Sequence, residues 1–210
     1  MKLHTFQTAE ELIFQTLEKI RQIFPDLGNS DGVMLAGGRT PIEIYRRAAA
    51  EGLSTPGKLF LSDERYVPVT DPQSNYGTIS PFFPNLGKVP TELPIEAAAQ
   101  AFHEDLKKIQ RIPLGLLGLG ADGHTASLFN LKDAALRDER LAIPVIKQEK
   151  PDRISVTPAL LRKVEKILIL ATGADKKEMI QTLLEKPETI PAGVALADHP
   201  HVEIRTDQVL

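Results

Sequence analysis

Four short apolar runs alternate along this chain with stretches of helical periodicity. The runs are VMLA (33–36), LFLS (59–62), LGLLGL (114–119) and ILILA (167–171). Each run is continuously apolar or nearly so, which predicts strands that are buried on both faces. When helices separate such strands, the pattern is typical of a mostly parallel sheet with helices on both of its faces. The pattern therefore predicts an α/β fold.

The best-marked helix is predicted at TPIEIYRRAAAEG, where Thr40 suits the N-cap and Pro41 the first helical position. Residues 66–95 are rich in Pro, Asn, Gly and Ser and predict mostly loop, and HPH (199–201) predicts a surface loop. Further helices are predicted at 10–24, 96–109 and 175–185, and further strands at VALA (194–197) and VEI (202–204).

The composition excludes several classes of function. The 210 residues suit one α/β domain or two very small ones, and a hydrophobic content of 42% is enough to bury a core. Since the chain has no cysteine, it forms no disulfide, thiolate nucleophile or cysteine-bound zinc site. The net charge of −3 predicts no nucleic-acid partner. The chain has no long apolar run, which predicts no membrane span, and its acidic N-terminal stretch predicts no signal peptide.

The residues that follow the four predicted strands are the best candidates for a ligand site. In a parallel sheet with helices on both faces, ligands bind beyond the carboxyl ends of the strands. The segments at those ends are GGRT (37–40), DERY (63–66), GADGHT (120–125) and GADKK (173–177). We therefore expect all four segments to open on one rim of the sheet.

Residues 118–123, GLGADG, fit the G-x-G-x-x-G pattern of dinucleotide-binding turns. Two observations count against a dinucleotide. First, Asp122 would place a carboxylate against the pyrophosphate. Second, a dinucleotide-binding fold needs an acidic residue about 20 positions later, at the end of the next strand, whereas the acidic residues at that distance here come before an apolar run. Because an isolated pattern of this kind is a weak signal, a dinucleotide site is the less favoured interpretation.

Each strand end allows a functional and a structural interpretation. Gly37 and Gly38 precede a helix start, which suits phosphate or an ordinary turn equally well. Arg65 suits a phosphate or an oxyanion, and Lys176 suits a nearby anion, but plain surface exposure would explain either side chain. His124 can shuttle a proton near neutral pH or act as a structural histidine, and no second histidine stands at a zinc-binding spacing from it.

Five segments resemble the successive signatures of the 6-phosphogluconolactonase family, which belongs to a larger group that includes glucosamine-6-phosphate deaminases. They are LAGGRTPIEIYRRAA, LSDERYVPVTDPQSNYG, LLGLGADGHTASLF, RISVTPALL and ILILATGADKKEMI. The resemblance as a whole runs from about Val33 to Asp207. The resemblance implies one Rossmann-like α/β domain over residues 1–210. It also implies hydrolysis of 6-phospho-D-glucono-1,5-lactone to 6-phosphogluconate, a step of the oxidative pentose phosphate pathway.

The same resemblance implies the partners of the chain. The substrate would be a sugar-phosphate lactone, with functional coupling to glucose-6-phosphate dehydrogenase, which makes that lactone. No cofactor and no metal ion are expected, and the expected location is cytoplasmic.

The resemblance also implies roles for single residues. His124 would be the general base that activates a water molecule, and Asp122 or Asp63 would orient or support it. Pro113 stands where the family usually has an aspartate, and Ile204 where it usually has a tryptophan, which bears on substrate affinity and on C-terminal packing. The residues implied in substrate binding are Gly37, Gly38, Arg39, Thr40, Arg65, Asn75, Arg153 and Lys176.

Two rival functions are weighed against the lactonase. A deaminase of the same group uses an acidic residue soon after the DGH turn, whereas this chain has none between His124 and Asp133. A sugar-phosphate sensor of this fold carries a DNA-binding helix-turn-helix domain. Because the α/β domain of this chain begins by residue 33, we expect no room for such a domain. A regulatory function that does not involve DNA binding remains an alternative.

Overall fold

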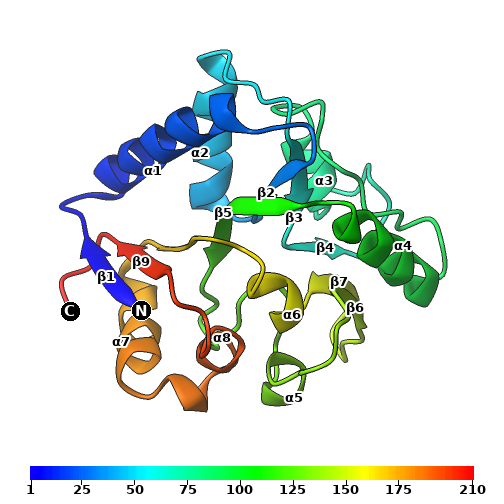
Figure 1. The fold of residues 1–210 in the computed structure, drawn as a ribbon. Coiled ribbons are helices and arrows are strands. Elements are labelled where there is room, and N and C mark those ends of the chain that lie inside the picture. Colours follow the sequence, from blue (N-terminus) through cyan, green and yellow to red (C-terminus); the bar gives the residue numbers. More distant parts are fainter.

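The computed structural model describes all of residues 1–210, and its centre is a six-stranded sheet (Figure 1). Neighbouring strands are parallel throughout. The order across the sheet is β1 (Lys2–Thr5), β9 (Val202–Thr206), β8 (Ile167–Ala171), β5 (Arg111–Gly118), β2 (Asp31–Leu35) and β3 (Lys58–Leu61). The four predicted strands are therefore confirmed, as is the candidate at VEI, which lies in β9.

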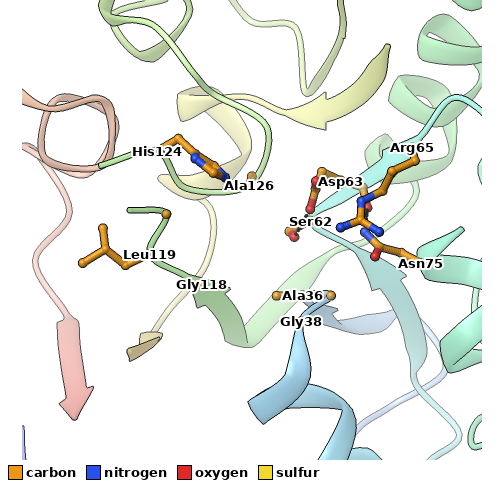
Figure 2. Close-up of a pocket in the computed structure, with 12 residues that line it drawn as sticks. Ala36, Gly38, Ser62, Asp63, Arg65, Asn75, Gly118, Leu119, His124 and Ala126 are labelled. Atoms are coloured by element: carbon orange, nitrogen blue, oxygen red, sulfur yellow. Dashed lines mark hydrogen bonds between the residues drawn. The ribbon is translucent and has the colours of Figure 1, made fainter. Parts of the chain in front are cut away.

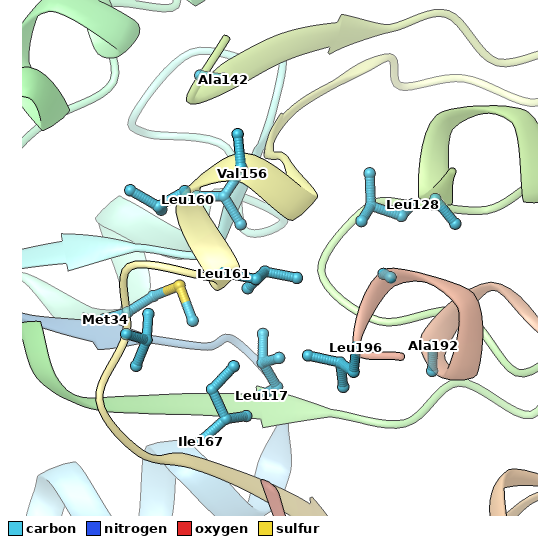
Figure 3. Packing of buried hydrophobic residues seen from close by; sticks show 14 of the residues in the cluster. Met34, Leu117, Leu128, Ala142, Val156, Leu160, Leu161, Ile167, Ala192 and Leu196 are labelled. Carbon is cyan, nitrogen blue, oxygen red and sulfur yellow. The ribbon is translucent and has the colours of Figure 1, made fainter. Parts of the chain in front are cut away.

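Two hydrophobic cores lie on the two faces of this sheet. Alternate residues of one strand enter different cores: Val33 and Leu35 pack under helices α1 (Ala9–Ile23) and α2 (Arg39–Ala50), while Met34 packs on the other face. The core that contains Met34 comprises 33 buried residues (Figure 3), and the core under α1 and α2 comprises 21. Burial on both faces explains why these strands are continuously apolar in sequence.

The larger core is covered by helices from the second half of the chain and by one from the middle. They are α4 (Ile95–Lys107), α6 (Pro158–Leu161), α7 (Lys177–Glu185) and α8 (Pro191–Ala195). The remaining short helices are α3 (Asn75–Ile79), α5 (Leu131–Ala134) and the 3-10 turns η1 (Phe24–Asp26), η2 (Ala174–Lys176) and η3 (Pro187–Thr189). The α/β fold with helices on both faces is confirmed. None of these helices is both long and apolar enough to span a bilayer.

A second sheet of three antiparallel strands was not predicted. Its order is β4 (Asp63–Arg65), β7 (Arg153–Val156) and β6 (Ala142–Val145). Only Ser62 separates β4 from the end of β3, so the charged DER segment is itself a strand. This arrangement places the small sheet beside the carboxyl ends of the central strands.

Three local predictions were wrong in whole or in part. Helix α2 begins at Arg39 with Gly38 as its N-cap, so Thr40 is inside the helix. VALA is not a strand: Val194 and Ala195 end helix α8, which starts at Pro191 with the helical φ that proline fixes, and Leu196 and Ala197 lie in the turn that follows. HPH does lie in a loop, with Pro200 and His201 exposed, but His199 is buried and its Nε2 is hydrogen-bonded to the carbonyl oxygen of Val164 at 2.7 Å.

Candidate active site

A pocket lies at the carboxyl ends of β2, β3 and β5, where β4 begins (Figure 2). This is the rim on which the predicted segments GGRT, DERY and GADGHT were expected to meet. The residues that line the pocket are Ala36, Gly37, Gly38, Ser62, Asp63, Arg65, Asn75, Gly118, Leu119, Gly120, His124 and Ala126.

His124 and Asp122 form a hydrogen-bonded pair on the β5 side of this pocket. The Nδ1 nitrogen of His124 is bonded to the Oδ1 oxygen of Asp122, which also accepts a hydrogen bond from the His124 backbone N–H at 3.3 Å. Burial acts to raise the pKa of Asp122, but the hydrogen bond and charge of His124 outweigh it and lower the pKa below its ordinary value. Because an ionised carboxylate only accepts, Nδ1 carries the proton and Nε2 is left as an acceptor.

Gly120 leaves the space that this pair occupies. A Cβ atom at Gly120 would lie 2.1 Å from Nδ1 of His124 and 2.5 Å from Oδ1 of Asp122. The other side of the imidazole packs against Phe129, with 4.4 Å between the ring centroids. The glycine pattern of this segment therefore makes room for a protein side chain, so the structure gives the dinucleotide interpretation no support.

Asp63 lies across the pocket from His124 (Figure 2). Its Oδ1 accepts a hydrogen bond from the hydroxyl of Ser62 at 2.8 Å, and its Oδ2 accepts one from the hydroxyl of Ser127 at 2.6 Å. Of the two aspartates that were predicted to support His124, Asp122 is thus the one that contacts it. Asp63 is held by serines.

Asn75 joins β4 to the GGRT turn. Its Nδ2 donates to the carbonyl oxygen of Asp63 at 2.9 Å. A Cβ atom at Gly37 would lie 2.2 Å from the Oδ1 oxygen of Asn75, so only glycine allows the turn to approach this closely. The two glycines of the turn line the pocket, whereas Arg39 is exposed and is not among the lining residues.

Glu64, which no sequence argument singled out, anchors the same wall from behind. It is only 1% exposed and accepts hydrogen bonds from the backbone N–H groups of Arg65, Asn75 and Tyr76, each at 2.7 Å. Burial raises the pKa of Glu64 above its ordinary value, against the lowering effect of these bonds. Alternation along β4 explains the arrangement, since Asp63 and Arg65 face the pocket and Glu64 faces α3.

Two arginines are cross-strand neighbours beside the pocket. Arg65 on β4 is paired in register with Arg153 on β7. Arg65 donates to the carbonyl oxygen of Gln73 at 2.5 Å, and Arg153 donates to those of Pro151 and Asp152. Burial lowers the pKa of Arg153, and the charge of Arg65 lowers it further. Two like charges placed opposite one another favour an anion between them.

Thr40 and Lys176 lie at the neighbouring end of β8. The hydroxyl of Thr40 is hydrogen-bonded at 2.7 Å to that of Thr172, which follows β8 directly. Lys176 ends η2 and lies 3.4 Å from Oδ2 of Asp175. Neither residue lines the pocket, and neither does Arg153, so these three predicted binding residues lie outside the walls formed by His124, Asp63 and Arg65.

The described chain is similar to proteins of known activity. A family profile described as glucosamine-6-phosphate isomerases/6-phosphogluconolactonase matches residues 6–204. A 6-phosphogluconolactonase from Thermotoga maritima is 32% identical over 170 residues, which cover 76% of this chain and 77% of that protein.

Solved structures extend the comparison to the whole fold. A 6-phosphogluconolactonase structure from Thermotoga maritima superposes with a TM-score of 0.81 at 27% identity, and the match covers 97% of both chains. A monomeric glucosamine-6-phosphate deaminase superposes with the same TM-score of 0.81 at 22% identity, covering 99% of this chain and 98% of that one. The fold alone therefore does not separate the two activities.

Proposed function

This chain belongs to the family of glucosamine-6-phosphate isomerases and 6-phosphogluconolactonases, and we propose that within it the chain is a lactonase. It hydrolyses 6-phospho-D-glucono-1,5-lactone to 6-phospho-D-gluconate. The observation that carries this choice is that His124, held by Asp122, lines the pocket with one imidazole nitrogen free to accept a proton, while no acidic residue follows it before Asp133. Lactone hydrolysis requires one such base.

The proposed reaction begins with water. Nε2 of His124 takes a proton from a water molecule as its oxygen attacks C1 of the lactone. The imidazolium then returns the proton to the ring oxygen as the C1–O bond breaks, so one histidine serves both steps. Catalysis of this kind typically contributes about 10²–10⁴-fold. Asp122 holds the required tautomer and stabilises the imidazolium, as a carboxylate does in hydrolytic triads.

The tetrahedral intermediate carries a negative charge on the former carbonyl oxygen. We assign its stabilisation to Arg65, which lines the pocket, or to backbone N–H groups of the glycine-rich turns. Asp63 contributes a fixed negative charge that complements the imidazolium formed during the reaction. Ser62 and Ser127 each donate a hydrogen bond to one of its oxygens, and the proposed reaction, in which His124 moves the proton in both steps, assigns it no proton transfer.

The phosphate group is proposed to bind beside this centre. Arg153, on the strand beside Arg65, offers a guanidinium group, and the GGRT turn offers the N-terminus of α2. The Thr40–Thr172 hydrogen bond joins that turn to the end of β8, after which Lys176 follows in η2, and we assign Lys176 to the same anion. Contacts to a group remote from the reacting carbon would orient the lactone.

The deaminase activity fits these residues less well. Ring opening of an amino sugar needs an acid at the ring oxygen, and the family's deaminases take it from soon after the DGH turn. Here the next acidic residue, Asp133, lies in α5 and does not line the pocket. Asp63 is the only carboxylate that lines the pocket and could act as a base on a sugar, and a serine hydroxyl donates to each of its oxygens.

We also propose the setting of the reaction. The substrate carries a phosphate dianion, which does not cross hydrocarbon unaided. The enzyme must therefore share a compartment with glucose-6-phosphate dehydrogenase, which supplies the lactone, and we propose that this compartment is the cytoplasm.

A coupled assay tests the proposed function. Glucose-6-phosphate dehydrogenase generates the lactone, and its disappearance is followed with the parent protein, with a His124→Ala variant and without protein. We expect rapid hydrolysis with the parent only, undiminished by a chelator, and no ammonia from glucosamine 6-phosphate. Ammonia release at a rate rivalling hydrolysis would reverse the choice, and a chelator-sensitive reaction would overturn the mechanism.

A further inference from the structure

The turn that carries His124 is shaped by its own hydrogen bonds. The hydroxyl of Thr125 donates to the carbonyl oxygen of Gly118 at 2.9 Å, and the N–H of Gly120 donates to that of His124 at 2.8 Å. These bonds close the turn on itself. They do not set the distance between His124 and the opposite wall of the pocket.

Ala126, the second residue after His124, has an unusual backbone. Its φ is +49°, and it is the only residue other than glycine with a positive φ. A side chain makes this left-handed conformation unfavourable, so it persists only where the surroundings impose it. The residue that follows it, Ser127, is 1% exposed, and both of its hydrogen bonds reach across to the second sheet.

These two bonds join the turn to neighbouring strands. The hydroxyl of Ser127 donates to Oδ2 of Asp63 on β4 at 2.6 Å, and its backbone N–H donates to the hydroxyl of Ser155 on β7 at 3.1 Å. Asp63 and Ser155 are themselves paired in register. Ser127 is the residue whose hydrogen bonds connect the turn to that strand pair.

We infer that Ser127 is a positioning residue, which fixes the turn that carries His124 to the carboxylate of Asp63; its effect on rate rests on the proposed function. The hydroxyl does not touch the reacting atoms. It acts through Asp63 and through the left-handed turn at Ala126, and it keeps the imidazole and the carboxylate at one separation across the pocket. Reactive groups misplaced by about 1 Å can cost on the order of 10²-fold in rate.

Four proteins test this inference: Ser127→Ala, Asp63→Asn, the double variant, and Thr16→Ala as the control. Thr16 also carries a buried hydroxyl, but it lies in α1 and bonds to Leu12 and Arg205, none of which lines the pocket. We expect Ser127→Ala to lower kcat by about 10-fold or more with KM changed by less than about threefold. In the Asp63→Asn background, the same serine substitution should cost little more, because the two residues act as one unit.

Hydrogen exchange gives a readout that does not depend on activity. In Ser127→Ala and in Asp63→Asn, amides of residues 122–129 should exchange faster, while those of β5 and β8 stay as in the parent. Thr16→Ala should leave residues 122–129 unchanged. If the parent hydrolyses no lactone, the proposed function fails and the exchange experiment still decides the positioning. Unchanged exchange in Ser127→Ala, or kcat losses that simply multiply in the double variant, would overturn the inference.

Discussion

The Nδ1 nitrogen of His124 is hydrogen-bonded to the Oδ1 oxygen of Asp122, a residue only two positions earlier in the chain. The pair is therefore assembled within one turn and does not depend on the docking of a distant element. Gly120 is part of the same arrangement, because its missing side chain leaves the volume into which the imidazole and the carboxylate fit.

Replacing His124 by alanine should abolish most of the activity without unfolding the protein. We expect kcat for lactone hydrolysis to fall by about 10²–10⁴-fold, as expected for the loss of a general base. Steady-state kinetics and a thermal unfolding curve check this together. A well-folded variant whose activity stays within a few-fold of the parent would remove His124 from the mechanism.

Asp122→Asn should also lower kcat for lactone hydrolysis. An asparagine can donate to Nδ1 and so stabilise the tautomer in which Nε2 carries the proton, which is the wrong form for a base. We expect kcat to fall by about 10²–10⁴-fold, in line with the same change in hydrolytic triads. Asp198→Asn is a matched control, since Asp198 is exposed and lies 3.5 Å from Arg137, outside the pocket. Equal activity of the two variants would contradict the assignment.

Gly120→Ala tests the space beside the histidine. The added Cβ would lie 2.1 Å from Nδ1 of His124, so the ring must move. We expect a loss of kcat on the order of 10²-fold while the variant remains folded. Gly28→Ala is the control, because a Cβ there would have its nearest contact at 3.6 Å. Full activity of Gly120→Ala would mean that the imidazole position is not critical.

The proposed phosphate site predicts a change in KM. Arg153→Ala should raise KM by about 10-fold while kcat falls less, since a contact equal in ground and transition states affects binding alone. Gluconolactone without the phosphate should be a far poorer substrate for the parent. Arg46→Ala, an exposed arginine of α2, should leave both constants unchanged. Equal kcat/KM for the two lactones would rule out the site.

Glu64 predicts a pH dependence of stability. Its pKa in the folded protein is raised above the ordinary value of 4.5, mainly by burial. The folded state then binds the proton more tightly than the unfolded state. The contribution of Glu64 to stability therefore grows as the pH falls through the raised pKa toward 4.5.

The comparison of the parent with Glu64→Gln isolates this effect. We expect the loss of unfolding free energy caused by the substitution to be larger near pH 5 than near pH 7. Denaturant titrations of both proteins at the two values measure it. A loss that is larger at the higher pH would show that hydrogen bonds to the carboxylate outweigh burial.

Four strands of the central sheet, β2, β3, β5 and β8, could be predicted because each is buried on both faces and therefore continuously apolar, whereas the exposed edge strand β1 was not predicted. The rim followed from the same pattern, since Gly37, Asp63 and His124 come directly after such strands. The second sheet could not be predicted, because β4 is a charged segment of three residues and pairs with Arg153–Val156, about 90 positions later. Its strand conformation comes from that pairing and not from local preference.

The two serines that hold Asp63 were missed for a related reason. Ser62 and Ser127 are small polar residues whose importance depends on the carboxylate opposite them, and Asp63 reaches Ser127 across 64 positions of sequence. For Thr40, in contrast, the local sequence predicted a role that the structure gives to another residue. Its position before Pro41 suggested a cap, but Gly38 takes that place and the hydroxyl of Thr40 bonds to Thr172.

The order of the strands has a consequence for the chain as it leaves the ribosome. Every residue that lines the pocket lies between Ala36 and Ala126, so the catalytic half is synthesised first. Yet β5 has an open edge until β8 is made, and β1, the earliest strand, has no partner until β9 emerges at residues 202–206. Unpaired edges of buried strands invite aggregation during synthesis. The first strand to be synthesised, β1, can therefore join the sheet only after the last strand, β9, has been synthesised.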